Sequence, residues 1–186
     1  MRLNMFRIAR EASPGWNVAK SLAQMVVLWG LFLFLGPFIV TRAEAALGIA
    51  GFTFAAQHMV GAALFAAASI GAVWSCVTMA RIGLGTPLPL DCARHLVVDG
   101  PYRFIRNPMA VVAMLQAFGV ALWLGSWMVF VYGLIGEAVW NWILRPLEER
   151  DLVERFGAAY EHYRDSVRCW VPTFPGYARS VENVER

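Results

Sequence analysis

The longest apolar stretch of this chain, residues 109–144, is too long to cross a lipid bilayer once. It is 36 residues long, and Glu137 is its only charged residue. A single helix of that length rises about 54 Å, whereas the hydrocarbon core of a bilayer is about 30 Å thick. Gly125 and Ser126 stand at its centre, and residues of these types favour turns. The stretch therefore predicts two short helices, of roughly 16 to 19 residues each, that form a tight hairpin.

Two earlier segments are also apolar enough to cross a membrane. Residues 21–40 and 53–80 contain no Asp, Glu, Lys or Arg, and a transmembrane helix needs about 20 such residues. Hydrophobic residues make up 59% of the chain, charged residues 16%, and the mean hydropathy is +0.52, so a bilayer must solvate much of the surface. We expect an all-α, polytopic transmembrane bundle of about four spans, in which small residues of the second span permit close helix contact.

Basic residues fall almost entirely on one side of these spans. Of the 16 lysines and arginines, Arg42 alone lies between the first and second spans. Cytoplasmic loops are rich in Lys and Arg, so we expect both termini and residues 81–108 to be cytoplasmic. Lys20 is the only lysine, and this bias toward arginine is typical of a GC-rich bacterial genome, which favours the bacterial inner membrane. The net charge of +3 suits an anionic membrane surface.

We expect one integral membrane domain over residues 1–186. Apolar and aromatic side chains recur at helical spacing from Leu147 to Tyr163, which predicts an amphipathic cytosolic helix that Gly157 interrupts. The three cysteines lie far apart without a CxxC pair, so we expect no disulfide framework and no metal site. The sequence has no stripe of basic and aromatic residues that would indicate nucleic-acid binding. The expected parts are a cytosolic N-terminal segment, a transmembrane core, and a cytosolic helix with its tail: residues 1–20, 21–145 and 146–186.

The third span begins with residues that favour an anion site. Pro108 suits the first turn of a helix, and Asn107 before it is a natural N-cap. The start of a helix is electropositive, and Arg103 and Arg106 reinforce that charge. Such a helix start at the membrane surface can bind a carboxylate or a phosphate.

The hairpin also brings acidic residues to this surface. Reflection of the chain about its central turn places Glu148 and Glu149 about one helical turn beyond the residue opposite Asn107. A zwitterionic cofactor, which carries both signs of charge, would suit this arrangement, and so would a phospholipid headgroup. In the alternative interpretation, these charged residues only anchor the apolar helices or form weak surface ion pairs.

A polar stripe continues from these acids into the membrane. Glu137, Asn141, Arg145 and Glu148 are spaced four, four and three residues apart, which places them on one helix face. Gln116 falls at the height of Glu137 in the hairpin. The residues Gln116, Glu137 and Asn141 therefore predict either the wall of a substrate channel or a structural hydrogen bond between Glu137 and Gln116.

At these residues the sequence resembles the isoprenylcysteine carboxyl methyltransferase and phospholipid methyltransferase superfamily. The resemblance extends over approximately residues 81–172, half of the chain, and has three parts in the order that the family shows. They are Gly85-Thr86-Pro87 with residues 96–109 (LVVDGPYRFIRNPM), the helical hairpin, and Glu148-Glu149-Arg150-Asp151-Leu152 followed by Phe156-Gly157, Tyr160, Tyr163 and Trp170-Val171-Pro172.

The resemblance implies a pocket for S-adenosylmethionine at the cytosolic end, closed by the C-terminal helix, with an amphiphilic or lipidated substrate that arrives laterally from the membrane lipids. The acceptor group would be a carboxylate, a thiol or an amine. We expect the cofactor to contact the following residues: Gly100, Tyr102, Arg103, Arg106, Asn107, Pro108, Glu148 and Glu149. Arg106 and Glu149 are the candidate catalytic residues, and for an amine acceptor Glu149 or His95 is the candidate base.

Two positions depart from the family pattern. Asn107 stands where the family often has a histidine, and Ala110 where it often has a tyrosine. An asparagine can hydrogen-bond a cofactor but cannot shuttle a proton at neutral pH. Two other functions therefore stay open: an NADPH-dependent membrane reductase with a similar C-terminal pocket, and a non-catalytic lipid-binding membrane protein.

Overall fold

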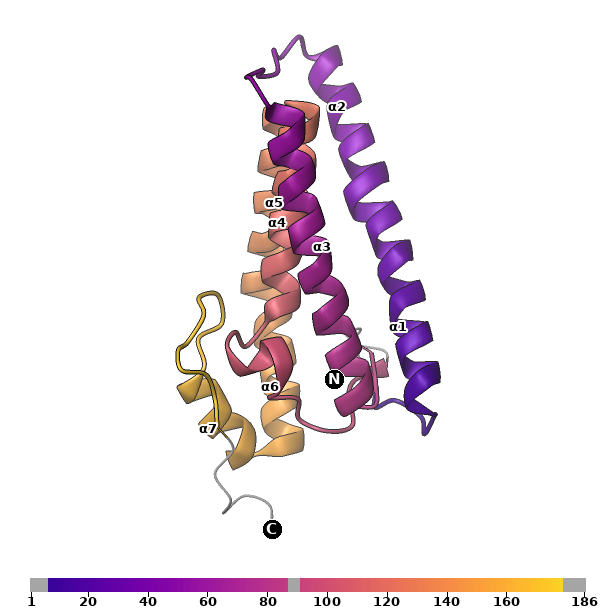
Figure 1. The fold of residues 1–186 in the computed structure, drawn as a ribbon, viewed down its shortest axis with the longest axis vertical. Coiled ribbons are helices and arrows are strands. Elements are labelled where there is room, and N and C mark those ends of the chain that lie inside the picture. The colour runs from indigo at the N-terminus through magenta and orange to yellow at the C-terminus, as the bar shows by residue number, and fades with distance from the viewer. Residues whose placement is uncertain (1–6, 87–90, 179–186) are drawn as a thin grey trace.

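In the computed structural model, which describes residues 7–86 and 91–178, the regular secondary structure is helical (Figure 1). Pro87 of the first motif and the ends of the expected terminal segments, residues 1–6 and 179–186, lie outside the described residues. The helices in chain order are α1 (Pro14–Trp29), η1 (Gly30–Leu35), α2 (Gly36–Ala46), α3 (Gln57–Ile82), η3 (Gly100–Arg103), α4 (Pro108–Leu124), α5 (Trp127–Val139), η4 (Trp140–Leu144), α6 (Arg145–Phe156) and α7 (Ala158–Ser166).

Four apolar helices confirm the predicted transmembrane bundle. α1, η1 and α2 form one continuous helix of 33 residues, and α5, η4 and α6 form another of 30 residues, each with a short π-helical segment inside it. Both are long and apolar enough to cross a membrane, as is α3, while α4 is apolar but shorter. The second span begins at Gln57 rather than at Thr53, because Ala56 before it adopts a left-handed conformation.

The central turn of the long apolar stretch lies where the sequence predicts it. α4 ends at Leu124, Gly125 adopts a left-handed φ of 65°, and α5 begins at Trp127. A side chain on Gly125 would meet the Phe52 carbonyl. Ser126 caps α5, since its hydroxyl accepts a hydrogen bond of 3.0 Å from the backbone N–H of Val129. The hairpin of α4 and α5 is therefore built by its two turn residues.

Close contact between α3 and α4 forms the centre of the bundle. Gly61 and Gly119 face each other, so that an added Cβ on Gly61 would lie 2.8 Å from the Gly119 carbonyl oxygen and one on Gly119 would lie 3.0 Å from that of Gly61. One turn closer to the start of α4, the buried Gln116 donates a 3.0 Å hydrogen bond to Ser69 of α3. The small residues of the second span permit this approach, as predicted.

At the opposite end from the charged elements, Glu44 joins α2 to the hairpin. This glutamate is buried, and it accepts hydrogen bonds from the Ser126 hydroxyl and from the backbone N–H of Met128, the latter at 3.3 Å. A carboxylate is favourable at the electropositive start of a helix. The first membrane helix is thereby fixed to the start of α5, a contact that the sequence analysis does not predict.

The remaining charged elements gather at one end of the bundle, which we call the charged end and which comprises the start of α1 with residues 91–107 and 145–178. Figure 1 shows α6 and α7 at this end, opposite the end at which α4 joins α5. α6 continues the helix of α5 and η4 without a break, so the prediction that a separate helix begins at Leu147 is wrong. The predicted interruption at Gly157, where φ is 52°, is confirmed.

Candidate active site

Arg106 and Glu149 meet at the mouth of the hairpin, as the sequence predicts. The Nη2 atom of Arg106 lies 3.1 Å from Oε1 of Glu149, and Nη1 of Arg145 lies 3.6 Å from the same oxygen. The Nη1 of Arg106 donates a 2.8 Å hydrogen bond to the carbonyl of Arg164 near the end of α7. Arg106 therefore joins the start of α4 to both α6 and α7.

One donor of Arg106 remains unused. Its Nε atom is buried and has no hydrogen-bond partner in the described structure. Buried donors without partners are rare in native proteins because leaving one unpaired costs free energy. The position of this donor, beside an ion pair at the charged end, suits a carboxylate oxygen of a bound ligand.

The carboxylate of Glu148 forms no ion pair in the described structure, and Arg155, which pairs with Asp151, acts on it only through a weaker electrostatic attraction. No Lys or Arg among the described residues lies within ion-pair distance of it, whereas the neighbouring Glu149 contacts two arginines. The apolar part of its helix ends at Leu144, so Glu148 lies beyond the membrane-spanning part. Burial, with a smaller contribution from the nearby Glu149 and Asp151, raises the pKa of Glu148 to about 7. A cationic ligand would stabilise the ionised carboxylate of Glu148 and lower its pKa.

Tyr102 supplies a second unsatisfied group beside Glu148. Its side chain is 5% exposed, and its hydroxyl has no hydrogen-bond partner in the described structure. Burial and then the charge of Glu148 raise the pKa of Tyr102 well above its ordinary value of 10.0, so the phenol stays protonated and can donate. The hydroxyl of Tyr163 in α7 donates a 2.6 Å hydrogen bond to the Tyr102 carbonyl and fixes its backbone.

Asn107 and Pro108 begin α4 as predicted. The Oδ1 atom of Asn107 accepts a 3.2 Å hydrogen bond from the backbone N–H of Ala110, so this oxygen is already engaged as the N-cap. Its amide NH₂ group is what remains for a ligand. Pro108, which is buried, has no N–H to satisfy at this position.

Gly100 and Arg103 occupy different surroundings from Arg106. Gly100 has a φ of 58°, and an added Cβ would lie 2.9 Å from Thr78 Oγ1 of α3, so a glycine is required for η3 to pack against that helix. Arg103 is exposed and lines a shallow depression of about 210 Å³ with Asp99 and Tyr177. The structure therefore places both residues beside the Arg106 and Glu149 pair and not within it.

The C-terminal segment covers the site. The backbone N–H of Thr173 donates to the Phe104 carbonyl and that of Tyr177 to the Arg103 carbonyl, each at 2.8 Å. The indole of Trp170 donates a 3.2 Å hydrogen bond to Asn141 in η4. The contact of Trp170 with Asn141 was not predicted, although Trp170 belongs to the Trp-Val-Pro part of the family resemblance.

The predicted hydrogen bond between Glu137 and Gln116 is wrong. Gln116 bonds to Ser69 of α3, and one carboxylate oxygen of Glu137 is buried without a partner in the described structure. Reflection about a turn gives the height of a residue in a hairpin but not the side of the helix on which it lies. Gln116 lies on the side of α4 that faces α3, while Asn141 accepts a hydrogen bond from Trp170. The alternative, a substrate-channel wall that contains Gln116, Glu137 and Asn141, stays a prediction.

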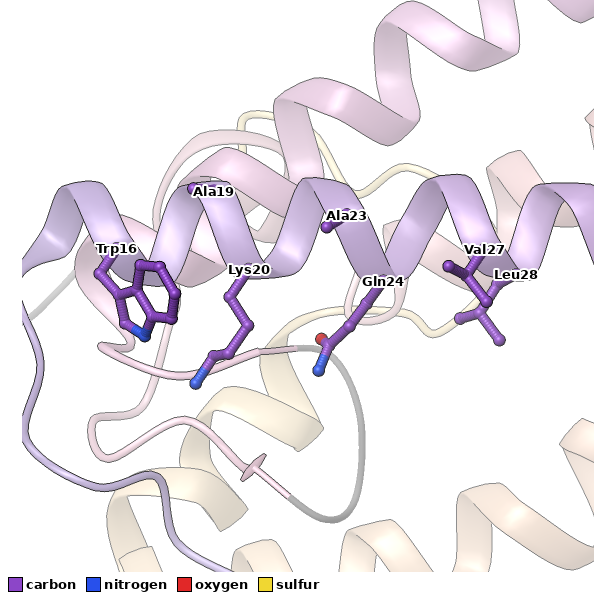
Figure 2. Close-up of a pocket in the computed structure, with 7 residues that line it drawn as sticks. All are labelled: Trp16, Ala19, Lys20, Ala23, Gln24, Val27 and Leu28. Carbon is purple, nitrogen blue, oxygen red and sulfur yellow. The ribbon is translucent and has the colours of Figure 1, made fainter.

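A larger hollow, of about 560 Å³, lies elsewhere on the molecule. Figure 2 shows that it lies along α1, where the side chains of Trp16, Lys20, Gln24 and Val27 project from the same side of the helix. Lys20 forms an ion pair with Asp91 there. Because a single helix lines this hollow and most of its surface is apolar, it is a lipid-facing strip and not an enclosed pocket.

A bundle of apolar helices with paired, opposite charges and unsatisfied polar groups at one end is the architecture of an integral membrane protein. The chain belongs to the phospholipid methyltransferase family, because the sequence profile of that family matches residues 56–159, more than half of its length. It is similar to the protein-S-isoprenylcysteine O-methyltransferase of Schizosaccharomyces pombe, with 36% identity over 83 residues. This match covers 43% of the chain and 34% of the yeast protein.

Proposed function

We propose that this protein transfers a methyl group from S-adenosylmethionine to an amphiphilic acceptor that resides in the membrane. Family membership supports methyl transfer. The observation that carries the choice of donor is the charge arrangement at the mouth of the hairpin. An arginine with one unused donor lies there beside Glu149, and Glu148 lies nearby without an ion pair among the described residues.

The described residues fit the two charges of the amino-acid part of this donor. The unused Nε–H of Arg106 and the amide of Asn107 would bind its carboxylate, with the start of α4 adding favourable electrostatics. Glu148 would bind its ammonium group. The hydroxyl of Tyr102, buried and unpartnered, would donate a further hydrogen bond to the ligand.

Bound S-adenosylmethionine supplies an electrophilic methyl group on a sulfonium sulfur. The protein's part is then to orient the two reactants and to exclude water, and these effects supply most of the catalysis in such a displacement. The C-terminal segment with Trp170 would exclude water. Glu149, held by Arg106 and Arg145, would position Arg106, and it would act as a base only for an amine acceptor.

We also propose a class of methyl acceptor and a location for the protein in the cell. The acceptor would be a lipid or a lipidated molecule with a carboxylate, thiol or amine that reaches the charged end from within the bilayer. The single domain of residues 1–186 would lie in a bacterial inner membrane with both termini in the cytoplasm, since its basic residues gather at the charged end.

Calorimetric titration of S-adenosylmethionine into the detergent-purified protein tests the proposed donor. We expect binding by the wild type and a loss of about tenfold or more in affinity for Arg106→Ala and for Glu148→Ala, because each variant removes a hydrogen bond to a charged group. Arg150→Ala and Glu154→Ala are matched controls, since both residues are exposed on α6, and they should bind as the wild type does.

The outcomes separate the three functions. Unchanged affinity in both site variants would refute the assignment of these residues. Binding of NADPH in place of S-adenosylmethionine would favour the reductase, and binding of neither compound would favour a non-catalytic lipid-binding protein.

A further inference from the structure

We infer that residues 168–175, which we call the C-terminal turn, insert their exposed apolar side chains into the lipid bilayer beside η4. The turn lies outside the residues 56–159 that match the family profile. In Figure 1 the chain after α7 (yellow) turns back from the charged end and runs up beside the helix bundle. The inference adds a membrane contact to the cover of the site and does not depend on which ligand the site binds.

Backbone hydrogen bonds fasten the C-terminal turn to the start of α4 and to η3. The N–H of Arg106 donates to the Arg168 carbonyl at 2.9 Å, and the N–H of Thr173 donates to the Phe104 carbonyl at 2.8 Å. Within the turn, the N–H of Arg168 donates to the Thr173 hydroxyl oxygen at 3.0 Å. The fold therefore sets which side chains of the turn face the protein and which face outward.

The turn has a protein-facing side and an exposed apolar side. Cys169 is buried, and the ring of Trp170 packs edge-on against that of Trp140 in η4, with ring centroids 5.5 Å apart. Val171 and Phe174, in contrast, are 55% and 78% exposed. Apolar side chains that gather on an exposed surface mark a contact with a protein or a membrane.

The contact with η4 places the turn at the depth of the bilayer surface. Trp170 packs against Trp140 and donates a hydrogen bond to Asn141. These two residues of η4 lie four and three positions before Leu144, where the apolar part of the helix ends, or about 5–6 Å inside that end. Interfacial apolar groups enter a bilayer by about 5–10 Å. The adjacent Trp142 is 74% exposed, so the exposed side of the turn continues the lipid-facing surface of this span.

Charge favours a lipid surface over a second copy of this chain as the partner. Arg168 of the turn and Arg103, whose carbonyl binds Tyr177, are both exposed. Among residues 7–86 and 91–178, neither arginine forms an ion pair. In a symmetric pair of chains the same patch of each copy meets the other, so these like charges would repel. The phosphates of anionic lipid headgroups would attract them, while the acyl chains would solvate Val171 and Phe174.

Spin labels at single positions test the depth of the turn. A nitroxide is attached to Phe174→Cys in the full chain, which is reconstituted in nanodiscs of phosphatidylethanolamine and phosphatidylglycerol. Its collisions with oxygen, which concentrates in the bilayer, are compared with those of a nickel chelate, which stays in water. We expect frequent collisions with oxygen and few with nickel, as at the lipid-facing control Ile135→Cys. Glu161→Cys, exposed on α7, should show the reverse.

The same measurement distinguishes the other environments. Frequent collisions with nickel at Phe174→Cys would place the turn in water, and few collisions with either reagent would show that a second copy covers it; both results overturn the inference. If Phe174→Cys does not fold, Val171→Cys takes its place and should give the same result. The native cysteines Cys76, Cys92 and Cys169 are buried, so the wild type treated with the same label should carry little of it and gives the background.

Discussion

At the scale of single residues, Arg106 and Glu148 differ in how their charges are balanced. Arg106 is bound by Glu149 at 3.1 Å and by the Arg164 carbonyl at 2.8 Å, so both of its terminal nitrogens have a partner. Glu148 has no such partner among the described residues, and its pKa is raised to about 7 by burial and by its acidic neighbours. Binding of a cationic ligand should therefore change the ionisation of Glu148 more than that of Arg106.

This difference predicts a pH dependence of donor binding. Because a cation binds the carboxylate and not the carboxylic acid, affinity for S-adenosylmethionine should rise as pH increases from about 6 to about 7, a range in which an α-amino group stays mostly charged. Calorimetric titrations across this range measure the effect. Glu148→Gln should bind weakly with little dependence on pH, whereas Glu154→Gln should retain the rise. The same rise in Glu148→Gln would contradict the assignment.

Folding stability should change with pH in the opposite direction. An acid whose pKa rises from 4.5 to about 7 on folding binds its proton more tightly in the folded chain. Its contribution to the free energy of unfolding therefore decreases as pH rises from about 4.5 to about 7. Ionisation of Glu148 thus favours ligand binding at the expense of stability, as is common at functional sites.

At the scale of the helices, the contact of α3 with α4 sets the position of the site. The start of α4 carries Asn107 and the preceding Arg106, and its middle is held against α3 by Gly61 and Gly119. The sequence predicts the hairpin because an apolar stretch of 36 residues with a central Gly-Ser pair has few other ways to fit a bilayer. It does not predict that Gln116 faces α3, since α4 is apolar on every side and its sequence does not favour one face for contact with α3.

Enlarging Gly61 should separate these two helices. An added Cβ would lie 2.7 Å from the backbone nitrogen of Trp123 and 2.8 Å from the Gly119 carbonyl oxygen, both of which are backbone atoms that cannot rotate away. We expect Gly61→Ala to lower the free energy of unfolding by about 1–3 kcal/mol, measured by thermal or denaturant unfolding in detergent.

Gly136→Ala provides the matched control. Gly136 is also helical, but nothing lies within 4 Å of its added Cβ. This variant should be neutral or slightly stabilised, because alanine favours a helix more than glycine does. Equal stability of the Gly61 and Gly136 variants would show that the α3 and α4 backbones are further apart than in this structure.

At the scale of the whole molecule, the sequence predicts the distribution of charge better than it predicts the contacts between distant segments. Helical periodicity and the placement of arginines anticipate the four spans and the charged end. The contact of Glu44 with Ser126, and that of Trp170 with Asn141, join segments 82 and 29 residues apart. Such contacts depend on the rotation and tilt of each helix, which apolar faces of similar composition do not specify.

Removal of the Glu44 carboxylate should weaken the bundle far from the site. Glu44→Ala leaves the Ser126 hydroxyl and the Met128 N–H without their acceptor, and we expect a loss of about 1–3 kcal/mol in the free energy of unfolding. Affinity for S-adenosylmethionine, measured by calorimetry on the folded variant, should stay within twofold of the wild type. Arg42→Ala, at an exposed position on the same helix, should change neither quantity, and a large loss of affinity in Glu44→Ala would show that the two ends are coupled.

The continuous helix from Trp127 to Phe156 has a consequence for the kinetics of the proposed reaction. Its last twelve residues, which carry Glu148 and Glu149, extend beyond the apolar part by about 18 Å, so the proposed reacting centre would lie level with the headgroups of one leaflet. A lipid acceptor would meet it by two-dimensional diffusion without leaving that leaflet. Turnover should then follow the mole fraction of the acceptor in the bilayer and fall under surface dilution, even when its bulk molarity is constant.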